Sequence, residues 1–328
     1  MTNSILLTGA LFVSASLSAA ELRIGIVGCD TSHVVAFTET FNNPQAKGHV
    51  SGGKVVAAYR GGSPDLPQSI DRVEGYAKTL REKYGVIFYD SIQALCTNVD
   101  VVLLESVDGR PHLEQVKPVI AAHKPVYVDK PAAASLGDAI EIFRLARAAN
   151  VPIFSSSSLR YARDTQAVHN GSIGKVFYAE TTSPLELEPH HPELFWYGIH
   201  GVESLFTVMG TGCETVQRTV GTNGLVEVTG IWSGGRKGIY RQEKQKVYGD
   251  NYHGIAKGEN GEARIGSFDG YEPLNEVIMK FFQTGVAPVP PEETIEIMAF
   301  MAAAQASKDT GGSVVKLADV MAKVSARR

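Results

Sequence analysis

This chain of 328 residues has few cysteines and no long basic run. Its three cysteines, Cys29, Cys96 and Cys213, are spaced singly, so they offer neither a disulfide framework nor metal-ligand spacing. We expect them to be small buried residues, and they predict no metal site. The formal net charge is −4 and no long basic run occurs, which argues against nucleic acid as a partner.

Only the N-terminus carries an extended apolar run. Residues 5–17 are rich in Leu, Val and Ala, and Ser18–Ala20 places small residues before Glu21, as at a signal-peptide cleavage site. The run is too short to span a bilayer comfortably, and no Lys or Arg precedes it. A misassigned start or a plain leading strand are the alternatives. We expect residues 1–20 to be a signal peptide and the mature chain to be periplasmic or otherwise exported, with no membrane contact after cleavage.

The alternation of apolar runs predicts two domains of different construction. From residue 21 to 155, short β-rich runs alternate with helical stretches, which is typical of a Rossmann-like, doubly wound, mostly parallel sheet in the α/β class. From residue 156 to 328, strand-like runs are separated by turn signals such as Asn223-Gly224. This second part predicts an α+β domain with an antiparallel sheet.

The first predicted strand runs into a loop where a dinucleotide-binding turn belongs. The standard fingerprint has three glycines, but here only Gly28 is kept, with Asp30 and His33 at the second and third positions. A carboxylate at Asp30 would repel a pyrophosphate by about 1 kcal/mol or more at contact distance. Thr31 and Ser32 hydroxyls and the helix N-terminus still favour an anion. Alternatively, Asp30 or Ser32 only caps the helix.

Arg60 follows the second predicted strand, beside two glycines. Sites selective for NAD usually place an acid here to hold the ribose hydroxyls, whereas an arginine can accommodate a 2′-phosphate. Arg60 therefore favours NADP if a dinucleotide binds, and the alternative is a phosphate or acidic ligand of another kind.

The stretch Val126–Asp129 predicts a buried strand that stops abruptly at Lys130-Pro131. Because proline cannot donate to a sheet ladder, Lys130 is left at the carboxyl end of a strand, where open α/β sheets bind ligands. An ammonium group there can hold a hydroxyl or carbonyl oxygen and pass a proton. A salt-bridged surface lysine is the alternative.

In this order, the motifs resemble those of the Gfo/Idh/MocA oxidoreductases over nearly all of residues 22–317. The matching segments are Gly25–Gly28, Val101–Leu104, His112 opening a helix, Asp129–Pro131, Leu159–Tyr161, Gly171–Val176, Pro291–Glu293 and Gly311–Leu317. The resemblance implies a dinucleotide-binding domain followed by an open antiparallel sheet, NAD or NADP as cofactor, and a sugar or polyol as substrate. It also implies a possible homo-oligomer. Further cofactor contacts are expected at Ser106, His112, Asp129 and Arg160.

The resemblance also implies roles for the reacting groups. Lys130 would bridge the nicotinamide site and the reacting hydroxyl. His200 matches the histidine of the family's Asp-x-x-x-His pair, but Trp196 stands where the aspartate would be. Histidine is suited to act as a base near neutral pH, and Tyr197 could relay the proton. The alternative is that Trp196, Tyr197 and His200 form the packing face of an amphipathic helix.

Two other functions stay open. The Tyr-x-x-His-Gly spacing also resembles a branch of the family that cleaves glycosides with a recycled nicotinamide cofactor. The altered glycine loop instead favours a carbohydrate-binding protein that has lost its cofactor. A polar loop precedes the helix of His200 and could line a polyol site, bind a metal or simply be solvated; it contains Glu186, Glu188, His190, His191 and Glu193.

Overall fold

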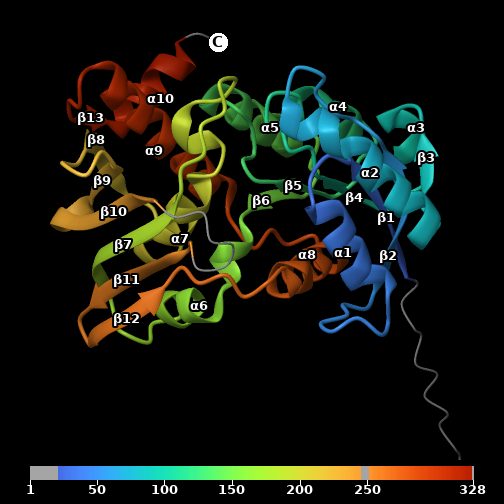
Figure 1. The fold of residues 1–328 in the computed structure, drawn as a ribbon, viewed down its shortest axis with the longest axis horizontal. Helices are drawn as coiled ribbons and strands as arrows, with labels where there is room; N and C mark the ends of the chain where they lie inside the picture. The colour runs from blue at the N-terminus through green and yellow to red at the C-terminus, as the bar shows by residue number, and fades with distance from the viewer. Residues whose placement is uncertain (1–20, 245–250, 327–328) are drawn as a thin grey trace, which may run out of the picture.

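The computed structural model describes residues 21–244 and 251–326, so the expected signal peptide lies outside the described residues. Two sheets stand side by side, with helices between and around them (Figure 1). None of the described helices is long and apolar enough to cross a bilayer.

The first sheet is the parallel, Rossmann-like sheet that the alternating pattern predicts. Its strands are, in spatial order, β3 (Ile87–Tyr89), β2 (Gly53–Tyr59), β1 (Leu22–Val27), β4 (Val101–Leu104), β5 (Val126–Asp129) and β6 (Ile153–Ser156). Every neighbouring pair is parallel. The carboxyl ends of β1, β4 and β5 therefore meet at one edge, because parallel strands all point the same way.

Helices cover both faces of this sheet. One face carries α1 (His33–Asn42), α2 (Pro67–Tyr84) and α8 (Glu272–Thr284), and the other carries α3 (Ile92–Cys96), α4 (His112–Ala121) and α5 (Leu136–Ala148). Within β4, Leu103 packs with the first group and Leu104 with the second. Burial on both faces explains why the strands read as continuous apolar runs. Although α8 comes late in the sequence, it packs beside α1 (Figure 1).

The second sheet is mixed rather than purely antiparallel. Its spatial order is β12 (Gly261–Ile265), β11 (His253–Gly258), β7 (Val176–Pro184), β10 (Arg236–Glu243), β9 (Val226–Trp232), β8 (Cys213–Val220) and β13 (Val315–Lys316). Among these described strands, β7 and β10 pair in parallel and the other neighbours are antiparallel. Alternation along a strand reports which face is buried, not which strand lies beside it, so the parallel pair could not be predicted.

Four helices of the second domain pack against its own sheet. They are α6 (Arg163–His169), α7 (Ile199–Met209), α9 (Pro291–Asp309) and α10 (Leu317–Ser325), with short 3₁₀ turns at Ser158–Tyr161, Glu193–Phe195 and Ser233–Gly235. Helix α7 packs on β7 and β10, while α9 packs on β8 and also on α5 of the first domain. The inner face of the second sheet is thus joined to the first domain (Figure 1).

A buried arginine ties this arrangement together. Arg160 follows β6, and its guanidinium donates to Glu203 of α7 and to Glu293 of α9, each at 2.6 Å. Its side chain is only 6 % exposed. A charge in such a site is stable only with its partners in place, so the pairs fix where α7 and α9 lie relative to the first sheet.

Replacing Arg160 by Met should lower the free energy of unfolding by about 3–5 kcal/mol, because two carboxylates lose their buried counter-charge. Denaturant unfolding of the two proteins measures the difference. Arg144→Met is the control, because that exposed side chain pairs with Glu141 on the same helix, and its replacement should change the free energy of unfolding little. Equal effects of the two substitutions would contradict a bridging role for Arg160.

Candidate active site

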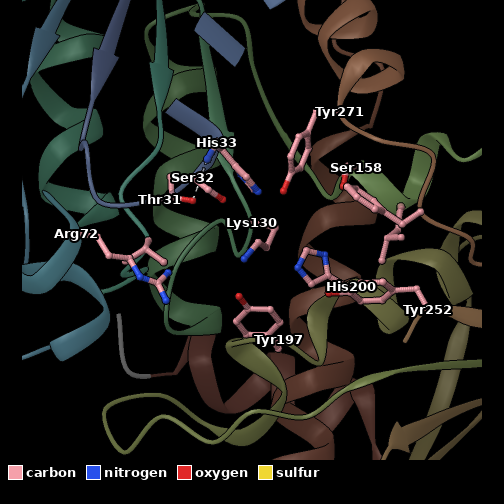
Figure 2. Close-up of a pocket in the computed structure, with 13 residues that line it drawn as sticks. Thr31, Ser32, His33, Arg72, Lys130, Ser158, Tyr197, His200, Tyr252 and Tyr271 are labelled. Carbon is pink, nitrogen blue, oxygen red and sulfur yellow. Dashed lines mark hydrogen bonds between the residues drawn. The ribbon is translucent and has the colours of Figure 1, made fainter. Parts of the chain in front are cut away.

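A cavity opens at the carboxyl edge of the first sheet, where the second domain faces it (Figure 2). It is lined by Thr31, Ser32, His33, Arg72, Val107, Lys130, Ser158, Leu159, Tyr197, His200, Tyr252, Phe268 and Tyr271. Six of these were expected from the sequence, namely Thr31, Ser32, His33, Lys130, Tyr197 and His200. Both domains therefore contribute to one site, at the place where doubly wound sheets bind ligands.

Lys130 stands in the middle of this cavity (Figure 2). It directly follows β5, and its Nζ lies 5.3 Å from the centre of the Tyr197 ring, which is a cation–π contact. Burial lowers the pKa of the Lys130 ammonium, although the carboxylates of Asp129 and Glu105 oppose this shift. Because Lys130 lines the cavity and is not an exposed side chain, it is not the surface lysine of the alternative interpretation.

His200 faces Lys130 from the first turn of α7. Its Nδ1 lies 2.8 Å from the hydroxyl oxygen of Ser157. Burial and the nearby charge of Lys130 hold the pKa of His200 well below its ordinary value. When Nδ1 carries the ring proton and donates it to Ser157, Nε2 is left as an unprotonated base.

Trp196 and Tyr197 have different environments, although they are neighbours in sequence. Trp196 is buried, with its ring 4.9 Å from that of His191, but it lies in the turn before α7 and not, as the alternative expected, on the face of a helix. Tyr197 instead lines the cavity, with its ring 5.8 Å from His200. The missing aspartate of the family pattern is thus not replaced by Trp196, and Ser157 orients the histidine instead.

Asp30 points away from the cavity. Its carboxylate accepts hydrogen bonds from the Ser69 hydroxyl at 2.6 Å and from the Val107 amide at 2.9 Å, and it is fully buried. It therefore joins α2 and the loop after β4 to the glycine loop. It makes no side-chain cap on α1, and neither does Ser32, so the capping alternative is wrong for both residues.

The other part of the loop remains suited to an anion. Thr31 and Ser32 line the cavity where α1 begins, and Arg72 of α2 reaches the same region (Figure 2). Backbone amides at a helix N-terminus and a guanidinium both favour phosphate oxygens. Arg72 was not expected from the sequence, because nothing in its local pattern says that α2 leans over the loop.

Two predicted cofactor residues are directed elsewhere. Arg60 donates from Nε to Glu74 at 2.5 Å and does not line the cavity, so its side chain is not presented to a 2′-phosphate there. Arg160 is the buried bridge between β6 and the helices α7 and α9, and it does not line the cavity either.

Ser106 and His112 have supporting positions behind the cavity wall. The Ser106 hydroxyl donates to Gln115 at 2.9 Å. The ring of His112 is fully buried between two carbonyl oxygens, with Nε2 2.9 Å from that of Ser106 and Nδ1 3.2 Å from that of Ala132. Burial lowers the pKa of His112, although the contacts with the two carbonyl oxygens oppose this shift, and the ring joins the loops after β4 and β5.

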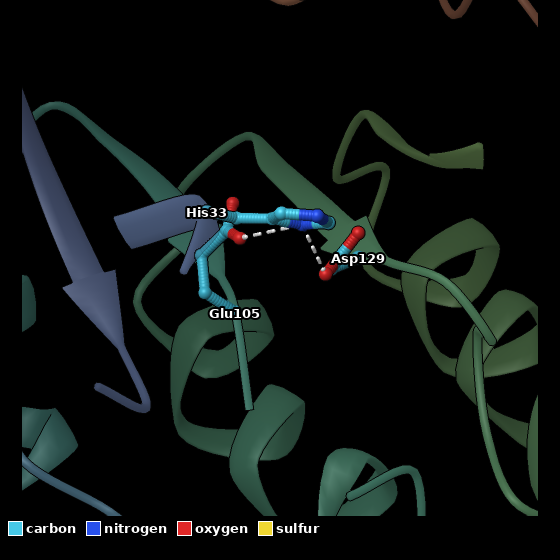
Figure 3. Close-up of side chains that lie close together, drawn as sticks. All are labelled: His33, Glu105 and Asp129. Atoms are coloured by element: carbon cyan, nitrogen blue, oxygen red, sulfur yellow. Dashed lines mark hydrogen bonds and ion pairs between the residues drawn. The ribbon is translucent and has the colours of Figure 1, made fainter. Parts of the chain in front are cut away.

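His33, Glu105 and Asp129 form a cluster at the carboxyl edge of the first sheet (Figure 3). His33 Nδ1 lies 2.8 Å from Asp129 Oδ2 and 3.8 Å from Glu105 Oε2. Burial and then the charge of Asp129 raise the pKa of Glu105 well above its ordinary value. Burial also opposes ionisation of Asp129, but the charge and hydrogen bond of His33 outweigh it and lower its pKa to about 2. Glu105 was not expected, although it directly follows β4 at the carboxyl edge.

The polar loop before α7 does not form one site. The buried His191 lies with its Nε2 3.1 Å from Asp108 of the first domain. Glu193 instead pairs with Lys308 at 2.6 Å and with Arg218. Among the residues that the structure describes, the one group of histidines and carboxylates close enough to share a metal ion is the cluster of Figure 3, not this loop.

The chain resembles known proteins both in sequence and in fold. The sequence model of the Gfo/Idh/MocA oxidoreductases, described as having an NAD-binding Rossmann fold, matches residues 22–156. The chain carries a Gfo/Idh/MocA domain. A comparison with curated proteins gives no match.

Solved structures resemble nearly the whole chain, the second domain included. A probable dehydrogenase from Thermotoga maritima aligns with a TM-score of 0.72 at 21% identity, covering 91% of this chain and 100% of that one. The myo-inositol dehydrogenase from Lactobacillus casei in complex with NAD(H) and myo-inositol aligns with a TM-score of 0.72 at 16% identity, covering 90% and 96%. An oxidoreductase from Agrobacterium radiobacter in complex with NAD+, L-tartaric acid and magnesium aligns with a TM-score of 0.69 at 16% identity, covering 92% of this chain and 99% of that one. At these identities the likeness concerns the fold.

The residues of the Gfo/Idh/MocA domain fit one end of a nicotinamide dinucleotide well. Lys130 and the start of α1 provide a place for the nicotinamide and phosphates, with Arg72 beside them. The loop after β2 is joined to the loop after β4, because the Ser63 hydroxyl donates to Asp108 at 2.6 Å. A Cβ added to Gly28 would lie 2.2 Å from the Ser106 hydroxyl oxygen.

Gly28→Ala should lower the free energy of unfolding by about 2–4 kcal/mol, because the new methyl group both collides with Ser106 and demands a φ of +87°. Thermal or denaturant unfolding measures this. In the control Gly85→Ala, φ is +68° and nothing lies within 4 Å of the added Cβ, so only the backbone strain of about 1–2 kcal/mol is expected. If Gly28→Ala lowered the free energy of unfolding no more than Gly85→Ala does, the loop would be able to move away from the added methyl group at little cost, which contradicts the prediction.

Proposed function

We propose that the protein is an oxidoreductase that removes hydride from a hydroxyl-bearing carbon of a polyol or sugar, with a nicotinamide cofactor. The observation that carries this proposal is the meeting of Lys130 from the first domain with His200 and Tyr197 from the second, in one cavity that begins at the N-terminus of α1. The family description and the NAD(H)-bound inositol dehydrogenase of the same fold support it.

Each residue of the cavity has its own part in this reaction. The Lys130 ammonium holds the reacting hydroxyl oxygen, and the neutral His200 accepts the hydroxyl proton at Nε2. Ser157 keeps the ring in that orientation through Nδ1. The Tyr197 phenol is close enough to His200 to donate a hydrogen bond to a neighbouring substrate hydroxyl. A bound nicotinamide would supply the hydride acceptor.

NAD rather than NADP is the proposed cofactor. The sequence alone favoured NADP because of Arg60, but this guanidinium is paired with Glu74 and with the carbonyl oxygen of Gly61. The phosphates would lie against Thr31, Ser32 and Arg72, where positive charge and amide donors are available.

Export of the protein is also proposed, on the apolar run and small residues that precede Glu21. Mass spectrometry of the chain after expression in a Gram-negative host tests it. A periplasmic protein beginning near Glu21 supports export, and an uncleaved cytoplasmic chain contradicts it.

The first experiment is to denature the purified chain, identify any released nicotinamide cofactor by mass spectrometry, and titrate the emptied protein with NAD+ and NADP+. Turnover is then followed with free inositols and hexoses, and separately with aryl glycosides. Cofactor binding with net reduction by a free polyol supports the proposal. Glycoside cleavage without net reduction would replace it by the hydrolase alternative, and no cofactor affinity would leave the binding-protein alternative.

Lys130→Met and His200→Asn should each lower kcat/KM by about 10²–10⁴-fold, because each removes a group that handles the reacting proton or oxygen. Steady-state kinetics with the best polyol measures this. His169→Asn is the matched control, because that histidine contacts the carbonyl of Thr207 outside the cavity and should leave turnover unchanged. Full turnover in either cavity variant would contradict the assigned roles.

The pH profile of kcat/KM should have its acid limb below pH 6.5, the ordinary histidine value. His200 works as a base only when neutral, and a lowered pKa keeps it neutral to lower pH. The alkaline limb should fall below 10.5, because Lys130 loses its proton earlier than an ordinary lysine. In His200→Asn the acid limb should disappear from the residual activity; its persistence would assign the limb to another group.

A further inference from the structure

Among the described residues, Glu105 is a buried acid for which the structure has so far shown no role. It is 0 % exposed, and neither carboxylate oxygen has a hydrogen-bond partner among the described residues. Buried polar groups are nearly always paired, and a carboxylate without a donor is costly to bury. The reaction proposed for Lys130 and His200 does not use Glu105, so its position calls for a positively charged partner.

The geometry of its neighbours suits a metal ion. One atom each from His33, Glu105 and Asp129 lie within 4.8 Å of one another. His33 Nδ1 is 2.8 Å from Asp129 Oδ2 and 3.8 Å from Glu105 Oε2 (Figure 3). Donor atoms that share an ion at about 2.0–2.2 Å lie about 3–4 Å apart, so small side-chain shifts would bring all three into coordination range.

Two of the three side chains are already held in place. Asp129 Oδ1 accepts from the backbone amide of Lys130 at 2.9 Å, which leaves Oδ2 directed at the cluster. The His33 ring stacks on Phe37 at 5.4 Å and meets the edge of Tyr271 at 4.7 Å, which fixes its plane. Such outer contacts orient ligands in metal sites.

We propose that His33 Nδ1, Glu105 and Asp129 bind one divalent transition-metal ion of the Mn²⁺ to Zn²⁺ series. One imidazole and two carboxylates are ligands that these ions accept, and the two negative charges offset that of the ion. Three protein ligands leave coordination positions open. Since His33 lines the cavity, an open position would face the space where a substrate hydroxyl lies.

The test uses the chain 21–328 without added cofactor or substrate, so that its outcome is independent of the oxidoreductase proposal. Metal content after purification is measured by mass spectrometry, and the chelator-treated protein is titrated calorimetrically with Mn²⁺ and with Zn²⁺. One ion per chain is expected. Glu105→Gln has the same shape but one ligand charge fewer, and it should lower the affinity by at least about 10–100-fold.

Asp30→Asn is the matched control. Asp30 is a buried carboxylate close to His33 in sequence, but both of its oxygens are already bonded, so this variant should keep the affinity of the original chain. Thermal unfolding reports whether each variant is folded, and the ion should raise the melting temperature of the original chain but not of Glu105→Gln. His33→Gln provides a second variant if Glu105→Gln does not fold.

Two results would overturn the proposal. One is the absence of stoichiometric binding of either ion, and the other is binding by Glu105→Gln and His33→Gln that equals that of the original chain. In both cases Glu105 would be an uncharged acid and His33 simply a hydrogen-bond partner of Asp129. Polyol oxidation with a metal-free protein would leave the proposed oxidoreductase function intact.

Discussion

The parallel pairing of β1, β4 and β5 is the constraint on which the rest of the site depends. Because the three strands point the same way, the residues after their last positions arrive at one edge of the sheet. His33, Glu105 and Lys130 are separated by tens of residues in sequence, yet this single fact brings them into contact range. The second domain has only to present α7 to that edge, and the buried Arg160 holds α7 in place.

Much of the fold could be predicted because each domain has a clear pattern. Doubly buried strands alternating with helices specify the first sheet almost strand by strand, and the stop at Lys130-Pro131 marks the site. The second sheet was predictable only in part: the short, largely exposed β12 has little apolar signal, and the parallel pairing of β7 with β10 leaves no trace in periodicity. The packing of α8 on the first domain could not be predicted either, because it depends on tertiary contacts between segments that are distant in sequence.

In the candidate site, too, residues marked by a local motif could be predicted, and residues placed by tertiary contacts could not. Lys130, Tyr197 and His200 were found because a motif or a strand end marks them. Arg60 and Arg160 were expected to contact a cofactor, but their guanidinium groups pair with carboxylates on the helices α2, α7 and α9, and no local pattern marks these partners. Conversely, Arg72 reaches the cavity from α2 and Tyr271 from the residue before α8, and no local pattern reveals how these helices lie.

Two buried carboxylates at this edge show how partners, rather than residue type, decide a role. Asp30 replaces a glycine of the dinucleotide fingerprint and, by sequence, should repel a phosphate. In the fold its two oxygens accept hydrogen bonds from the Ser69 hydroxyl and the Val107 amide, so Asp30 joins these segments and leaves the anion contacts to Thr31 and Ser32. Glu105 is equally buried but has no such donors among the described residues. The same edge of the sheet therefore holds one carboxylate whose hydrogen bonds are complete and one whose oxygens have no donor among the described residues. Because Asp30 is turned away from the cavity, its presence in the loop does not by itself remove the anion contacts of Thr31 and Ser32.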